Sequence, residues 1–126
     1  MEEKIKILVV DDQEAIRVLI EELFQLIFNN SAEIFIASSG NEALEKINSD
    51  FSLVLTDQEM PGMLGTELIA RIKEIFPDMK VVLMSGNFSA EKAAAAGADG
   101  FLAKPFGIAK TKGILSFILP IMNILK

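Results

Sequence analysis

The chain has 126 residues, of which 51% are hydrophobic and 24% are charged, and this is the size and composition of one globular domain. Eighteen acidic residues against twelve basic ones give a formal net charge of −6, which argues against direct binding of nucleic acid. Because the chain has no Cys and no His, disulfides, Cys/His zinc sites and histidine-based catalysis are excluded. Any chemistry must come from Asp, Glu, Lys, Ser or Thr.

Five short apolar runs predict the strands of a parallel sheet. The first and fourth are almost continuously apolar, which is typical of strands that are buried on both faces. The runs are Ile5–Val10, Glu33–Ala37, Leu53–Thr56, Lys80–Met84 and Gly100–Ala103.

Segments with helical periodicity separate these runs. The clearest extends from Ile16 to Ile27, with apolar residues at positions i, i+3, i+4, i+7, i+8 and i+11. Further helices are expected over Asn41–Ile47, over Gly65–Ile75, from a Ser89 cap to Ala96, and from about Ile108 onward.

Five strands that are each followed by a helix predict an α/β fold, a doubly wound (βα)5 three-layer sandwich with right-handed crossovers. We expect a single domain over residues 1–126, with its core at about 4–117 and an apolar C-terminal helix and tail at 108–126. In such sheets functional groups gather beyond the carboxyl ends of the strands.

Polar residues follow four of the predicted strands: Asp11 and Asp12, then Asp57, then Ser85, then Lys104. Each one alone would be read as a turn, cap or surface residue. Together they are harder to explain, because like charges about 4 Å apart repel by roughly 4 kcal/mol at an effective dielectric near 20. A hard divalent cation such as Mg²⁺, together with the lysine, would neutralise three carboxylates at one edge of the sheet.

These residues resemble the receiver domain of two-component response regulators, from Lys4 to about Phe117. Four motifs carry the resemblance: ILVVDD ending at Asp12, TDQEMPGMLG starting at Thr56, and the segments MSG and AKPF at the ends of the fourth and fifth strands. The resemblance implies a flavodoxin-like, five-stranded parallel sheet with the strand order 2-1-3-4-5.

The resemblance also implies roles for the acidic residues. Asp57 would be the phosphoacceptor, and Asp12 and Asp57 would bind Mg²⁺ directly. Asp11 would contribute through water, and the backbone carbonyl of Glu59 would be a further ligand. The side chains of Glu59 and Asn87 would flank the water path to the acyl phosphate and tune its lifetime.

Three further positions have roles in the resembling family. Ser85 and Lys104 would contact the phosphoryl oxygens, and the Lys104–Pro105 peptide bond would be cis. Phe101 would rotate inward as Ser85 moves toward the phosphoryl group. A static core phenylalanine is the other interpretation of Phe101, since it has no hydroxyl to donate.

The implied function is a signalling switch rather than an enzyme. A sensor histidine kinase or histidine phosphotransfer protein would phosphorylate Asp57, and the changed surface would bind an effector. One alternative is a pseudo-receiver scaffold that works without phosphorylation. Another is a small Mg²⁺-dependent phosphatase that uses Asp57 as nucleophile, although Glu59 stands where such enzymes carry a second Asp.

The end of the chain is unusually apolar. Nine of the twelve residues at 114–125 are apolar, but this stretch is too short to span a bilayer and contains Pro120. The surplus over one buried helix face predicts a homodimer or partner contact through the last helix. The N-terminus lacks the features of a signal peptide, so we expect a cytoplasmic protein without a membrane span.

Overall fold

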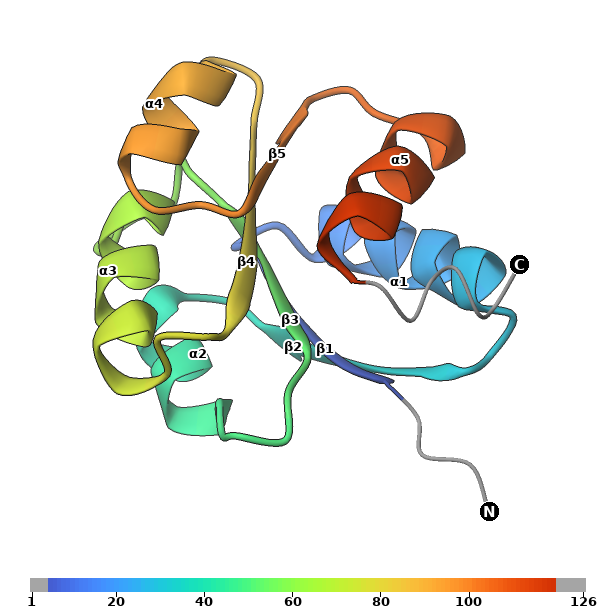
Figure 1. The fold of residues 1–126 in the computed structure, drawn as a ribbon, viewed down its shortest axis with the longest axis horizontal. Helices are drawn as coiled ribbons and strands as arrows, with labels where there is room; N and C mark the ends of the chain where they lie inside the picture. The colour runs from blue at the N-terminus through green and yellow to red at the C-terminus, as the bar shows by residue number, and fades with distance from the viewer. Residues whose placement is uncertain (1–4, 120–126) are drawn as a thin grey trace.

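The computed structural model describes residues 5–119 of the chain. At its centre is a five-stranded parallel sheet with the order β2-β1-β3-β4-β5, which confirms the predicted fold (Figure 1). The strands are β1 (Ile5–Val10), β2 (Ala32–Ala37), β3 (Leu53–Asp57), β4 (Lys80–Ser85) and β5 (Gly100–Ala103). The helices are α1 (Glu14–Phe28), α2 (Gly40–Lys46), α3 (Gly65–Ile75), α4 (Ala90–Ala95) and α5 (Ile108–Ile118).

Helices cover both faces of the sheet, with α1 and α5 on one face and α2, α3 and α4 on the other (Figure 1). Successive side chains of a strand point to opposite faces. In β1, Ile7 and Val9 therefore belong to the core under α1 and α5, whereas Leu8 and Val10 belong to the core under the other three helices. This two-sided burial explains why β1 is a continuous apolar run in the sequence.

The strand ends differ slightly from the prediction. Strands β3 and β4 each extend one residue further than expected, so Asp57 and Ser85 are the last residues of their strands. The reason is pairing with a neighbouring strand: Asp57 is in register with Met84, and Ser85 with Ala103. Strand β2 also begins one residue early, at Ala32.

Side chains cap the two short helices as helix termini require. The predicted Ser89 cap of α4 is confirmed, because its hydroxyl accepts a hydrogen bond from the backbone N–H of Lys92 at 3.1 Å. At α2, the cap is Ser39, whose hydroxyl accepts from the backbone N–H of Glu42 at 3.1 Å. The Glu42 carboxylate in turn accepts hydrogen bonds from the backbone N–H of Ser38 at 2.6 Å and from its hydroxyl at 2.8 Å. These bonds lower the pKa of Glu42 to about 2.

Helix α5 buries only part of its apolar surface. Leu115 and Ile118 lie in the core, but the Phe117 side chain is 85% exposed. The apolar tail and Pro120 lie outside the described residues, so the homodimer contact through the last helix stays a prediction. In the part of the chain that the structure describes, no helix has the length and apolar character needed to cross a membrane.

Two glycines provide a matched test of packing beside Asp57. A Cβ at Gly65, the first residue of α3, would overlap with the backbone carbonyl of Asp57 and lie 2.7 Å from Cδ1 of Leu83. We expect Gly65→Ala to lower the free energy of unfolding by about 1–3 kcal/mol. Gly113 lies inside α5 with open space around it, so Gly113→Ala should raise the free energy by about 0.5–1 kcal/mol. Urea denaturation measures both, and a Gly65→Ala variant as stable as the wild type would contradict the packing argument.

Candidate functional site

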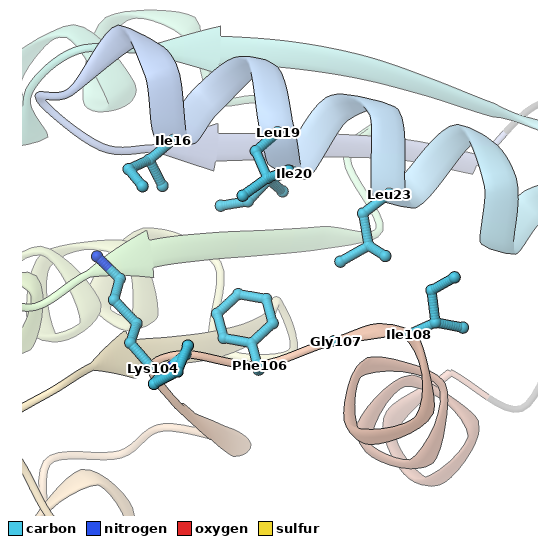
Figure 2. Close-up of a pocket in the computed structure, with 9 residues that line it drawn as sticks. Ile16, Leu19, Ile20, Leu23, Lys104, Phe106, Gly107 and Ile108 are labelled. Atoms are coloured by element: carbon cyan, nitrogen blue, oxygen red, sulfur yellow. The ribbon is translucent and has the colours of Figure 1, made fainter.

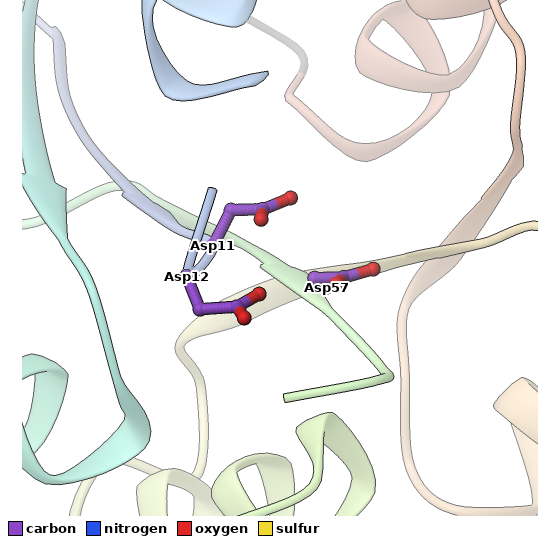
Figure 3. Close-up of side chains that lie close together, drawn as sticks. All are labelled: Asp11, Asp12 and Asp57. Atoms are coloured by element: carbon purple, nitrogen blue, oxygen red, sulfur yellow. The ribbon is translucent and has the colours of Figure 1, made fainter. Parts of the chain in front are cut away.

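Three carboxylates meet at the carboxyl edge of the sheet. Asp11 and Asp12 follow β1 and Asp57 ends β3; β1 and β3 are adjacent and parallel, so both end at the same edge. One carboxylate oxygen of each lies within 4.8 Å of the others. Figure 3 shows the three side chains close together at this edge. Asp11 and Asp57 are buried, whereas Asp12 is exposed to solvent.

Lys104 provides positive charge at this cluster. It follows β5, and its Nζ donates a hydrogen bond to Oδ1 of Asp57 at 3.0 Å and a longer one to Oδ2 of Asp11 at 3.5 Å. Its backbone N–H donates to the carbonyl of Ser85 at 2.9 Å, which fixes the base of the side chain. The Lys104–Pro105 peptide bond is cis.

The charges in this pocket are not balanced. Burial raises the pKa of Asp57, and the negative charges of Asp11 and Glu59 raise it further, although the Lys104 hydrogen bond opposes them. Burial lowers the pKa of Lys104, but its hydrogen bond to Asp57 and the charges of Asp57 and Asp11 outweigh burial, so that pKa lies above its ordinary value. One ammonium therefore does not compensate for the carboxylates.

The donor set fits Mg²⁺. Asp11, Asp12 and Asp57 offer only oxygen ligands, the kind that this hard cation prefers. Burial first, and the neighbouring carboxylates after it, raise the pKa of Asp57 despite Lys104, so a bound cation would stabilise its ionised form. The exposed position of Asp12 leaves one side open to the water molecules that Mg²⁺ usually keeps.

Ser85 lies at the same edge, but its hydroxyl is bonded to Glu59. It donates to both carboxylate oxygens of Glu59, at 2.9 Å to Oε1 and 2.8 Å to Oε2, and accepts from the backbone N–H of Asn87 at 3.0 Å. The sequence predicts a role for the Glu59 backbone carbonyl and a place near the water path, but this side-chain contact was missed. The sequence did contain a signal for this contact: Glu59 comes two residues after Asp57, and Ser85 ends the adjacent strand.

The other predicted switch residues lie nearby in different surroundings. Phe101, in β5, is half-buried and packs against the core cluster under α2, α3 and α4. The Asn87 side chain is exposed, and its described contact is the backbone bond to Ser85. Rotation of Phe101 and tuning of the phosphoryl lifetime by Glu59 and Asn87 stay predictions.

Two residues without a predicted role hold the site loops in place. The side-chain carbonyl of Gln58 accepts from the backbone N–H of Thr66 at 2.8 Å, and so caps α3 directly beside Asp57. Arg17 of α1 donates from Nη1 to the backbone carbonyl of Asp11 at 2.7 Å. Leu64 was the signal for this role of Gln58. It occupies the N-cap position of α3 but has no polar side chain, so another residue has to cap the helix.

Comparison with known proteins identifies this arrangement. Residues 7–115 match the family described as the response regulator receiver domain. The chain belongs to this family. It is 33% identical over 122 residues to sporulation initiation phosphotransferase F of Bacillus subtilis, covering 94% of this chain and 96% of that protein.

Solved receiver structures also resemble this receiver domain in fold. A response regulator receiver domain protein from Clostridium thermocellum superposes with a TM-score of 0.83 at 28% identity, covering 97% of this chain and 99% of the other. The response regulator TrrA from Thermotoga maritima, in complex with Mg²⁺ and BeF, gives a TM-score of 0.78 at 33% identity, covering 91% and 99%. The protein is thus a receiver domain of two-component signalling, whose general function is a phosphorylation switch rather than classical enzyme turnover.

The imbalance of charge predicts a stabilising substitution. Because the pKa of Asp57 is raised in the folded receiver, ionised Asp57 destabilises the metal-free fold. We expect Asp57→Asn to raise the melting temperature in EDTA at pH 7 by a few degrees. The gain in melting temperature should be complete at pH values above the raised pKa of Asp57. It should disappear as the pH falls below 3.8, the ordinary pKa of an Asp side chain.

Thermal melts of the metal-free protein over this pH range measure the effect. The control is Asp78→Asn, which removes an exposed Asp outside the site and should change the melting temperature little. A lower melting temperature for Asp57→Asn at pH 7 would contradict the electrostatic argument.

Proposed function

We propose that this receiver domain is switched by a phosphoryl group that Asp57 accepts from a sensor histidine kinase or a histidine phosphotransfer protein. One observation carries the proposal: Asp57 is buried at the end of β3, 3.0 Å from the Lys104 ammonium and beside the carboxylates of Asp11 and Asp12. The Mg²⁺ and BeF complex of the related TrrA supports the same interpretation.

The chemistry is a phosphoryl transfer between two nucleophiles. A carboxylate oxygen of Asp57 attacks phosphorus in line as the P–N bond of the phosphohistidine breaks. The leaving nitrogen takes the electron pair, and the imidazole leaves neutral because its other ring nitrogen already carries a proton. The Lys104 ammonium and the Ser85 hydroxyl contact the transferred oxygens. Asp57 thereby changes from one negative charge to nearly two on the phosphoryl group.

Mg²⁺ completes the site in this proposal. Asp12 and Asp57 would bind it directly, Asp11 would contribute through water, and the backbone carbonyl of Glu59 would be a further ligand. When bound, the ion supplies charge neutralisation for the phosphoryl oxygens. The nucleophile itself is held by Lys104, whose Nζ donates a hydrogen bond to Oδ1 of Asp57 at 3.0 Å.

An apolar groove beside the pocket is suited to the phosphodonor protein. It has a volume of about 520 Å³ and lies between α1 and the segment that joins β5 to α5 (Figure 2). Lys104 lines both the groove and the Asp57 pocket, so a protein in the groove is next to the phosphoacceptor. The lining is otherwise Ile16, Leu19, Ile20, Leu23, Pro105, Phe106, Gly107 and Ile108. We propose that an apolar helix face of the donor docks there.

The output of the switch is proposed for the opposite side of the pocket. Ser85 ends β4, and Phe101 lies in the adjacent strand β5 against the core under α3 and α4. A movement of Ser85 toward the phosphoryl group would change the packing around Phe101 and alter the surface that an effector binds. The family match over residues 7–115 supports treating the chain as one domain.

Phosphorylation can be tested directly by intact mass. Incubation with phosphoramidate and Mg²⁺ should add one phosphoryl group, about 80 Da, to the wild type and nothing to Asp57→Asn. The Lys104→Ala variant should still bind Mg²⁺, but phosphorylation of its Asp57 should no longer change the surface that binds the effector. Labelling of Asp57→Asn at the wild-type rate would refute the site.

The same incubation separates the alternatives when free inorganic phosphate is measured alongside the intact mass. A wild type that stays unlabelled supports a pseudo-receiver scaffold that works by binding alone. Continuous release of inorganic phosphate from many phosphodonor molecules, without a stable phosphoprotein, supports a phosphatase with Asp57 as nucleophile.

Docking in the groove is tested with two leucines of the same helix. Leu19 lines the groove and is 61% exposed, whereas Leu26 is 71% exposed on α1 outside the groove. We expect Leu19→Glu to reduce the rate of phosphotransfer from a histidine phosphotransfer domain, relative to the rate from phosphoramidate, about tenfold or more. Leu26→Glu is the matched control and should leave this ratio near the wild-type value. Equal ratios for both variants would place the docking surface elsewhere.

A further inference from the structure

We propose that Glu59 is a latch on the Ser85 hydroxyl, which must be released before Ser85 can bind a phosphoryl group on Asp57. The inference rests on the proposed function and concerns its regulation. It makes Glu59 a positioning residue that acts through Ser85 and sets how readily the receiver switches.

The hydroxyl of Ser85 has one proton, and Glu59 holds it. The donor distances to the two carboxylate oxygens are 2.8 and 2.9 Å, and the Ser85 oxygen also accepts from the Asn87 N–H at 3.0 Å. Ser85 is fully buried, so water has no direct access to its hydroxyl, whereas Glu59 is exposed to solvent. A hydrogen bond from a hydroxyl to an ionised carboxylate is stronger than one between neutral groups.

The backbone leaves Ser85 little freedom other than rotation of its side chain. Its residue pairs with Ala103 in the ladder between β4 and β5, and its carbonyl accepts from the backbone N–H of Lys104 at 2.9 Å. Strand β3 lies on its other side, where Asp57 pairs with Met84. The hydroxyl can therefore turn toward Glu59 or toward the oxygens on Asp57, but its single proton serves one of them at a time.

Phosphorylation supplies the force that opens the latch. The Glu59 carboxylate is close enough to Asp57 for its negative charge to act on that side chain. Phosphorylation replaces the single negative charge of Asp57 with nearly two and brings three strong acceptor oxygens there. The phosphoryl group therefore repels the Glu59 carboxylate and competes for the Ser85 proton, so one event weakens the old contact and offers a better one.

A double-mutant cycle with a phosphoryl mimic tests the latch. Beryllofluoride is titrated into the Mg²⁺-loaded protein and its affinity is measured from amide NMR spectra. In the wild-type background, Glu59→Ala removes both the latch and the charge repulsion, so we expect about tenfold tighter binding. In the Ser85→Ala background only the repulsion remains, and the gain from Glu59→Ala should be at least about threefold smaller.

Glu59→Gln separates the hydrogen bond from the charge. The Gln side chain keeps an oxygen that can accept from Ser85 but is neutral. Glu59→Gln should therefore bind beryllofluoride with an affinity between those of the wild type and Glu59→Ala. In metal-free protein, Glu59→Ala should also shift the Asn87 amide resonance much more than Glu59→Gln does, because the Asn87 N–H bonds to the hydroxyl that the latch holds.

The outcomes distinguish the latch from the proposed function. Equal gains from Glu59→Ala in the wild-type and Ser85→Ala backgrounds overturn the latch and leave repulsion alone, while the phosphorylation of Asp57 still stands. A wild type that neither binds beryllofluoride nor is labelled on Asp57 overturns the proposed function and the latch with it. If Ser85→Ala does not fold, Ser85→Cys replaces it in the cycle, because a thiol is only a weak donor.

Discussion

Unbalanced negative charge at the carboxyl edge of the sheet is the constraint on which this site depends. The strand order places β1 beside β3, and this brings Asp11 and Asp12 against Asp57 in a partly buried pocket. Burial and the neighbouring carboxylates raise the pKa of Asp57 even though the Lys104 ammonium donates a hydrogen bond to it. Arg17 and Gln58 hydrogen-bond to the backbone next to this pocket, Arg17 to the carbonyl of Asp11 and Gln58 to the N–H of Thr66. A site built this way is ready for a cation and for a phosphoryl group.

The pocket separates two sides of the molecule. Lys104 belongs to the side that faces the apolar groove between α1 and the segment before α5. Ser85 and Glu59 belong to the side that adjoins β4 and the helices α3 and α4. A donor protein in the groove and an effector on the other side would both act on Asp57 without sharing a surface. In our proposals, this arrangement lets one residue receive a signal and pass it on.

The contact between Ser85 and Glu59 gives the unphosphorylated state a stabilising interaction of its own. A switch of two states responds to a ligand only through contacts that differ between the states. Lys104 contacts Asp57 in the structure, so it cannot by itself distinguish the two states sharply. The Ser85 hydroxyl can, because its proton has two alternative acceptors.

The sequence by itself determined the sheet, its two-sided burial and the edge where the polar residues collect. These properties follow from the backbone: a period of two residues separates the faces of a strand, and all parallel strands end at one edge. Asp11, Asp12, Asp57, Ser85 and Lys104 could therefore be assigned to one edge by their places after apolar runs. Only the tertiary structure decided which partner each side chain takes. The Glu59 contact to Ser85 and the groove beside Lys104 join segments far apart in the chain, so they depend on how the strands and helices pack. The Gln58 cap on α3 is more local, but it depends on how the chain turns between β3 and α3.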